Sequence, residues 1–182
     1  SYPTYNLSTF DQDYSKLVSD TVGTPLLNRA IGGAYAPGST FKPITAIAGL
    51  EEGAITLSDI INCTGIYEEV SNPIRCWKYP GFHGPLNVVG GIENSCNYFF
   101  YNVGYQLATS SGSYNEEAGL ETLSKYADLY GLTDKSGVEI GEYAPDVSTK
   151  DPVRSAIGQG SNSYTTVGLA RYVTTIANSG TC

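Results

Sequence analysis

The sequence contains no methionine, one histidine, one tryptophan and few basic residues. Its longest apolar stretch, residues 44–50, is much shorter than the about 20 residues of a membrane-spanning helix. Ten Lys and Arg against 18 Asp and Glu give a net charge of −8. The basic residues are scattered, which excludes nucleic acid and anionic membrane surfaces as partners. Because methionine is absent and the first residue is Ser1, we expect this soluble piece to belong to a longer product.

The chain is long enough for one domain with a sizeable core, and 41% of its 182 residues are hydrophobic. Its opening, residues 1–5, is typical of the tail of a strand, and residues 11–13 of a loop. Glycine and proline punctuate residues 59–85, which indicates an irregular loop. Apolar residues recur with helical spacing elsewhere and predict helices over 39–52, 87–94, 96–108, 117–130 and 165–177.

Ser39 and Lys42 lie three positions apart at the start of the first predicted helix. A serine hydroxyl is a poor nucleophile until a nearby base takes its proton, and residues three apart on a helix share a face. Unpaired amides at a helix start also help to hold a developing oxyanion. Pro43 is compatible with this first turn, whose amides have no internal partner. S-x-x-K is nevertheless common on solvated helix faces, so the pair indicates nucleophilic catalysis only together with its context.

That context resembles a known enzyme family. Residues 28–30 (NRA) and 35–43 (YAPGSTFKP) are similar to the active-serine segment of class B penicillin-binding proteins, especially the elongation-type transpeptidases. Residues 93–100 (ENSCNYFF) are similar to the family's second motif, S-x-N, on a turn between two helices. IGQG at 157–160, LAR at 169–171 and IAN at 176–178 resemble the stretch before its third motif. The likeness covers nearly the whole chain.

The resemblance implies that Ser39 attacks the D-Ala-D-Ala carbonyl of a peptidoglycan stem peptide and forms an acyl-enzyme, with Lys42 as the base. Ser95 would relay a proton to the leaving amine, and Asn97 would hydrogen-bond the amide backbone of the substrate. A β-lactam mimics the dipeptide, so it would acylate Ser39 and leave slowly. Considered by themselves, Ser95 and Asn97 are equally typical of helix caps.

The resemblance also implies an α/β parent fold, an antiparallel sheet flanked by helices as in the β-lactamases and transpeptidases. The family's first strands would precede Ser1, and its third motif, Lys-Thr/Ser-Gly, would follow Cys182. We therefore expect residues 1–182 to be a partial transpeptidase domain, mostly its helical part with little strand, and not a complete catalyst. The parent would be anchored on the extracytoplasmic face of the bacterial cell membrane, together with a membrane glycosyltransferase.

Cys63, Cys76, His83 and Cys96 comprise three of the four cysteines and the only histidine. Thiolates and an imidazole are the ligands of closed tetrahedral zinc sites, and the first three lie in the irregular stretch 59–85. If the neighbours of Cys96 face the cleft, Cys96 must point towards this loop. Some elongation-type relatives look similar here, with a zinc bound by Cys, His or Asp, and with Asp where this chain has Cys63 and Cys76. Such a zinc would be structural and would support the S-x-N turn.

Other interpretations of these residues remain open. Cys63 and Cys76 are compatible with a disulfide under extracytoplasmic conditions. Cys96 also fits a small buried apolar residue, with His83 as an ordinary loop residue. We interpret Trp77 as packing the loop rather than binding substrate, and Cys182 as unrelated to the cluster.

Two other functions are compatible with the sequence. A class D β-lactamase or β-lactam sensor also carries S-T-F-K, although its second motif usually ends in an aliphatic residue where this chain has Asn97. A non-catalytic scaffold of the wall-synthesis complex is the other alternative, because the third motif is absent from these residues.

Overall fold

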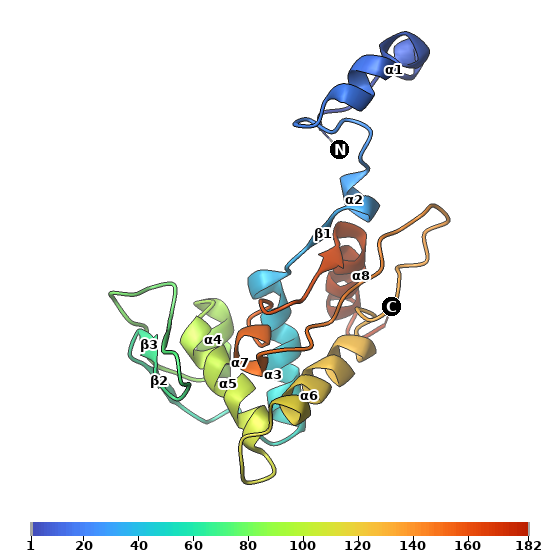
Figure 1. Cartoon of the computed structure of the whole chain (residues 1–182). Helices are drawn as coiled ribbons and strands as arrows, with labels where there is room; N and C mark the ends of the chain where they lie inside the picture. Colours follow the sequence, from blue (N-terminus) through green and yellow to red (C-terminus); the bar gives the residue numbers. More distant parts are fainter. Residues whose placement is uncertain (1, 182) are drawn as a thin grey trace.

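The computed structural model describes residues 2–181 and is built mainly from helices (Figure 1). Four of the five predicted helices have both ends within one residue of the prediction, and the fifth begins as a 3-10 turn, η2 (Gly38–Phe41), before becoming α-helical. The helices are α1 (Phe10–Ser19), α2 (Arg29–Gly32), α3 (Lys42–Glu51), α4 (Val88–Glu93), α5 (Asn97–Thr109), α6 (Glu116–Leu129), α7 (Pro152–Ser155) and α8 (Thr166–Ala177).

The strands are short and form three separate antiparallel pairs, β1 with β6, β2 with β5 and β3 with β4. They are β1 (Ala34–Tyr35), β2 (Ile61–Cys63), β3 (Ile66–Tyr67), β4 (Ile74–Arg75), β5 (Gly84–Leu86) and β6 (Tyr164–Thr165). Two of the pairs order the stretch predicted as an irregular loop. The expectation of a helix-rich piece with little strand is therefore confirmed. No helix within residues 2–181 is long and apolar enough to span a bilayer.

The core is built around α5, which packs against α3, α6 and α7, and α3 also packs against α6 (Figure 1). Ile44 and Ala48 of α3 are fully buried, and so are Phe100 and Val103 of α5. These positions follow the apolar spacing from which the two helices were predicted. Because α3 is buried on several sides, its first turn is held rigidly at the surface of this core.

Two residues at helix ends adopt the capping arrangements that their residue types favour. Gly131, directly after α6 and its C-cap residue, has a φ of +71°, the left-handed conformation that glycine adopts without a steric penalty. Thr165 caps α8, since its hydroxyl accepts a hydrogen bond from the backbone N–H of Gly168 at 3.0 Å.

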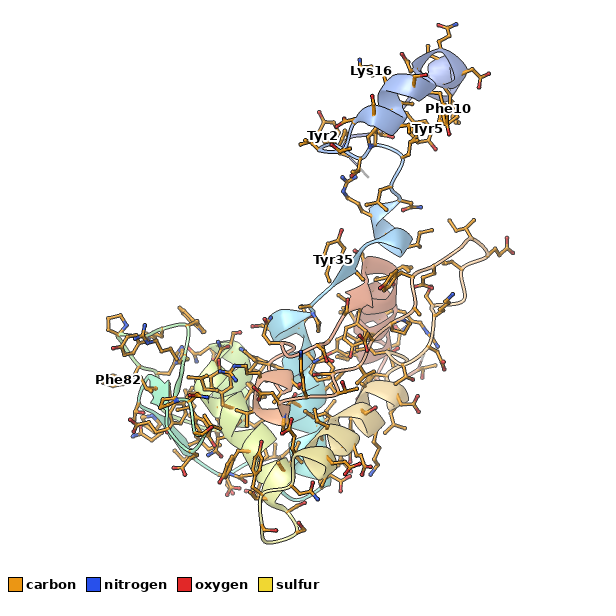
Figure 2. The ribbon with its side chains drawn as sticks, viewed as in Figure 1. Tyr2, Tyr5, Phe10, Lys16, Tyr35 and Phe82 are labelled. Atoms are coloured by element: carbon orange, nitrogen blue, oxygen red, sulfur yellow. The ribbon has the colours of Figure 1, made fainter. Side chains whose placement is uncertain are left out.

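Residues 2–23 form an arm that projects away from the core, and here the sequence prediction was wrong (Figures 1 and 2). The expected loop at 11–13 lies inside α1, and residues 2–5 are irregular rather than strand, followed by the 3-10 turn η1 (Leu7–Thr9). Ser1 lies outside the described residues. Asp11 and Asp13 occupy the first turn of α1, where carboxylates favour the helix. α1 has no buried residue, so its only ring packing is local, between Tyr5, Phe10 and Tyr14.

Candidate active site

Ser39 and Lys42 lie in the turn that leads into α3, and their side chains touch. The Nζ atom of Lys42 is 3.1 Å from the Oγ atom of Ser39. The η2 turn explains this closeness, because a 3-10 helix has three residues per turn and eclipses side chains three positions apart. Ser39 is exposed to solvent, whereas Lys42 is only 2% exposed. The solvent-accessible hydroxyl of Ser39 is thus within hydrogen-bonding distance of the buried amine of Lys42.

The S-x-N turn between α4 and α5 surrounds the same amine. Lys42 Nζ lies 2.7 Å from the carbonyl oxygen of Ser95 and 2.7 Å from Oδ1 of Asn97. The Oγ atom of Ser95 is 3.0 Å from Lys42 Nζ and 2.9 Å from Ser39 Oγ. The four residues predicted as catalytic therefore converge on one point, although more than 50 positions separate the two motifs.

These distances describe how a neutral Lys42 would be oriented. A neutral amine has two N–H donors and one lone pair, and its two shortest contacts are to pure acceptors, the Ser95 carbonyl and Asn97 Oδ1. With both N–H groups used there, the lone pair is left for the hydroxyl of Ser39. The site can thus hold Lys42 as a base directed at the serine.

The lowered pKa of Lys42 makes the neutral amine accessible. Burial lowers the pKa of its amine from the ordinary 10.5 to about 8, while the thiols of Cys96 and Cys76, when ionised, act in the opposite direction. At a pKa of about 8, roughly a tenth of the amine is neutral at pH 7. An ordinary lysine would be almost entirely protonated.

The glycine-kinked loop at 157–160 supports the serine turn from behind. The backbone N–H of Gly38 donates to the carbonyl of Gly158 at 3.0 Å. A Cβ atom on Gly158 would lie 2.2 Å from the carbonyl oxygen of Gly38, so the two backbones can approach only because residue 158 is glycine. From α8, the hydroxyl of Tyr172 donates to the carbonyl of Thr40 at 2.9 Å. The loop at 157–160 and Tyr172 therefore hold the turn that carries Ser39 in place.

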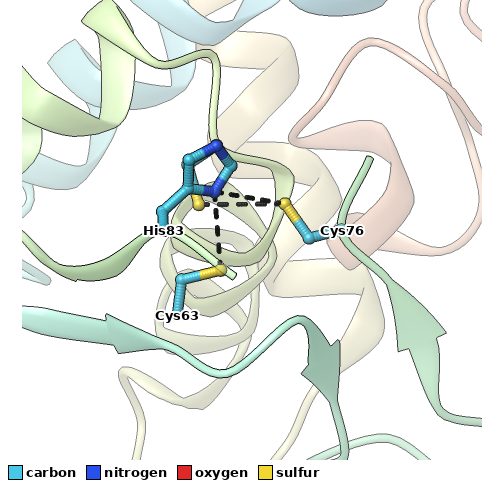
Figure 3. A group of neighbouring side chains, drawn as sticks. Cys63, Cys76 and His83 are labelled. Atoms are coloured by element: carbon cyan, nitrogen blue, oxygen red, sulfur yellow. Dashed lines mark hydrogen bonds between the residues drawn. The ribbon is translucent and has the colours of Figure 1, made fainter. Parts of the chain in front are cut away.

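Cys63, Cys76, His83 and Cys96 come together beside the S-x-N turn. Figure 3 shows the side chains of Cys63, Cys76 and His83 pointing towards one another. The ligand atoms of all four residues lie within 4.8 Å of one another, and the three cysteines are buried free thiols. Cys96 lies at the start of α5 and points away from Ser39, as the alternation of the S-x-N motif predicts. Cys182 lies outside the described residues.

Three separations within this cluster are close to the edges of a tetrahedral zinc site, and all four ligand atoms lie within 4.8 Å of one another. Nδ1 of His83 is 3.6 Å from the sulfur of Cys63 and 3.6 Å from that of Cys76, and the sulfurs of Cys76 and Cys96 are 4.0 Å apart. Zinc–sulfur bonds of about 2.3 Å and a zinc–nitrogen bond of about 2.05 Å at tetrahedral angles require edges of about 3.6 Å for N···S and about 3.8 Å for S···S. A disulfide would need a sulfur separation of about 2.05 Å.

The neighbouring thiols of Cys76 and Cys96 shift each other's pKa in opposite directions. Hydrogen bonding from Cys96 lowers the pKa of the Cys76 thiol to about 4, and the same interaction raises the pKa of Cys96. Since thiolates are the form that binds metal, Cys76 is the thiol of the pair that more readily reaches that form.

Trp77 has a contact that the sequence interpretation missed. We interpreted it as loop packing, but it is 60% exposed and its indole Nε1 donates to the carbonyl of Ser95 at 3.0 Å. Its position directly after Cys76 of the cluster was the only available signal, because no spacing rule connects residue 77 to residue 95.

Comparisons with known proteins agree with this geometry. The family of penicillin binding protein transpeptidase domains matches residues 1–182. The peptidoglycan D,D-transpeptidase MrdA of Escherichia coli K12 is 34% identical over 149 residues, which cover 78% of this chain and 22% of that protein. PBP2 of Helicobacter pylori in complex with MreC has a TM-score of 0.86 and 29% identity, over 98% of this chain and 35% of that chain. Penicillin-binding protein A of Mycobacterium tuberculosis, solved as a penicillin G acyl-enzyme, has a TM-score of 0.79 and 25% identity, over 99% and 42%.

The first curated relatives extend well beyond the matched region, since the chain spans 22% to 29% of their length. The family match nevertheless covers every residue, and the structural neighbours share both the helical arrangement and its connectivity. This chain belongs to the penicillin-binding protein transpeptidase family.

Proposed function

We propose that the protein containing this chain is a peptidoglycan D,D-transpeptidase that works through a serine acyl-enzyme. The observation that supports this most directly is the position of Ser39 Oγ, 3.1 Å from the buried amine of Lys42 and 2.9 Å from Ser95 Oγ. A hydroxyl between a base and a second hydroxyl has both groups that acyl transfer requires.

In the proposed reaction, Ser39 Oγ attacks the carbonyl carbon of the D-Ala-D-Ala bond while its proton moves to Lys42 Nζ. As the tetrahedral intermediate collapses, the C–N bond breaks and Ser95 Oγ relays a proton to the departing amine of D-Ala. An ester on Ser39 remains. The amine of a second stem peptide then attacks this ester, forms the cross-link and returns the proton to the serine. Asn97, oriented by its contact with Lys42, is placed to bind the substrate backbone.

Inhibition by β-lactams follows from the same geometry. The strained lactam amide presents a carbonyl to Ser39 and opens to an ester, but its amine stays attached and blocks the incoming nucleophile. The relative from Mycobacterium tuberculosis forms such an acyl-enzyme with penicillin G.

For the cysteine–histidine cluster we propose a structural zinc ion held by Cys63, Cys76, His83 and Cys96. The edges of the cluster support this. Four protein ligands leave no open coordination position, so the ion would supply no Lewis acidity to the reaction. Its part would be to join the loop at 63–83 to Cys96, between Ser95 and Asn97.

We further propose that the whole protein is anchored at the extracytoplasmic face of the cell membrane. Cross-linking consumes newly made glycan strands, so a membrane glycosyltransferase that makes them is the partner we propose. Residues 1–182 would be the helical portion of the transpeptidase domain, and the first sheet strands and the Lys-Thr/Ser-Gly motif would be supplied from outside these residues.

Labelling by a fluorescent penicillin tests the function directly. The complete protein is expected to take up one equivalent, and Ser39→Ala is expected to take up none, because it removes the attacking oxygen. Exposed Ser58 provides a control, since Ser58→Ala is expected to label normally. Absence of labelling in the folded wild-type protein would favour the scaffold, and rapid turnover of a chromogenic cephalosporin would favour a β-lactamase.

The rate of acylation is expected to depend on pH through Lys42. Only the neutral amine accepts the serine proton, so below its pKa of about 8 the rate should fall about tenfold for each pH unit, and above that pKa it should level off. Stopped-flow acylation between pH 5.5 and 9.5 measures this profile. A rate that is flat across pH 6 to 9 would contradict Lys42 as the base.

A further inference from the structure

The carbonyl of Ser95 is the point where two separate parts of the molecule meet. Lys42 Nζ approaches this oxygen at 2.7 Å from the core, and Trp77 Nε1 approaches it at 3.0 Å from the metal-site loop. A carbonyl oxygen has two lone pairs, so these two donors satisfy it completely. The indole also reaches the carbonyl of Asn94 at 3.3 Å. Trp77 therefore spans the end of α4 and the first residue of the S-x-N motif.

Ser95 needs such support because its backbone is in a rarely populated conformation. Its φ is +47°, a left-handed value that is unfavourable for a residue with a Cβ atom. This conformation turns the Ser95 carbonyl and the Asn97 side chain towards the same amine. Strained backbone at a functional site persists only where surrounding contacts determine it.

Trp77 is itself held in place while most of its surface stays open. Its ring meets the ring of His83 edge-on, with centroids 5.2 Å apart, and the residue is 60% exposed. Burial of apolar area therefore accounts for little of its presence here. The specific contact of Trp77, the only tryptophan in the sequence, is the hydrogen bond from its indole N–H to the carbonyl of Ser95 at the edge of the site.

We propose that Trp77 is a positioning residue for acylation: its indole N–H holds the Ser95 carbonyl so that Lys42 is directed at Ser39. This rests on the proposed transpeptidase function but not on the zinc ion. The proposed zinc ion would bind Cys96, the residue after Ser95, whereas the indole N–H hydrogen-bonds to the carbonyl of Ser95 itself. Removing the N–H should loosen the turn and leave all four cluster residues in place.

Trp77→Phe in the complete protein tests the proposal, because it keeps an aromatic ring and removes the donor. Replacing the indole by the isosteric benzothiophene ring removes the N–H with no change of shape. Tyr79→Phe is the matched control: it alters an aromatic residue of the same loop, whose ring stacks on Arg75, and keeps that ring. For each protein we would measure the noncovalent dissociation constant of benzylpenicillin, the rate constant of the acylation step and the zinc content.

Both Trp77 variants are expected to lower the acylation rate constant about tenfold, the upper range for one hydrogen bond. The dissociation constant and the zinc content should stay within twofold of wild type, and Tyr79→Phe should match wild type throughout. An unchanged acylation rate constant would overturn the proposal. So would a loss that appears only in the dissociation constant, or one that accompanies loss of zinc, since either would assign Trp77 a merely structural role. If wild type itself is not acylated, the proposed function fails instead.

Discussion

Replacing Lys42 by methionine is expected to lower the acylation rate about 1,000-fold, the middle of the range for loss of a general base. The amine touches Ser39, Ser95 and Asn97 at once. Methionine fills a similar volume but cannot accept a proton or donate to the two oxygens. The measurement is single-turnover acylation by a chromogenic cephalosporin in the complete protein, at pH 8.

The choice of methionine over alanine follows from the burial of this residue. Lys42 is 2% exposed and its Nζ atom lies 5.7 Å from the ring centre of Phe100, so this side chain packs in the core as well as carrying the amine. Alanine would leave a cavity in addition to unpaired acceptors. A slower acylation rate could then reflect lost stability and not only the lost base. Methionine removes the amine and its hydrogen bonds but keeps most of the buried volume.

Lys125→Met provides the control for this experiment. Lys125 lies on α6 with its side chain 59% exposed and pairs with Glu52 at 2.6 Å, so its loss should leave acylation unchanged. A folded Lys42→Met protein that retains more than a tenth of the wild-type acylation rate would remove Lys42 from the role of base. Circular dichroism and a melting curve establish that the variant is folded.

The sequence predicted most of the active site because its chemistry is carried by short motifs. Ser39 and Lys42 are joined by one helical turn, so their contact follows from spacing alone. Their meeting with Ser95 and Asn97 depends on the packing of α3 against α4 and α5, which the family resemblance implied and spacing could not. Because Ser95 and Asn97 were expected to face the cleft, Cys96 was expected to point the other way, towards the loop at 59–85.

What the sequence could not predict depends on contacts without a local pattern. The bond from Trp77 to the Ser95 carbonyl crosses 18 positions and is fixed by the course of the loop. The helix α1 was missed although its apolar residues Phe10, Tyr14, Leu17 and Val18 have helical spacing; it buries none of them. Aspartates that usually indicate a loop stand instead in its first turn.

Loss of the zinc proposed for the cluster is expected to have the second large effect. The purified wild-type protein should contain one equivalent of zinc, and Cys96→Ser should contain less than a tenth of that, because it replaces a thiolate by a weakly binding hydroxyl. A ligand about 1,000-fold above its dissociation constant stabilises the folded state by about 4 kcal/mol. In a domain of this size that corresponds to a fall in melting temperature of roughly 10 °C.

Serine is the informative substitute because it preserves the other contact of Cys96. The sulfur of Cys96 accepts a hydrogen bond from the backbone N–H of Phe99 at 3.4 Å and caps α5. Serine is among the best residues at a helix N-cap, so α5 keeps its start and any loss reports on the metal. Acylation should fall as well, since Cys96 lies between Ser95 and Asn97. A wild-type protein with three reactive thiols and no zinc would rule out the metal, and one with a single reactive thiol among Cys63, Cys76 and Cys96 would establish a disulfide in its place.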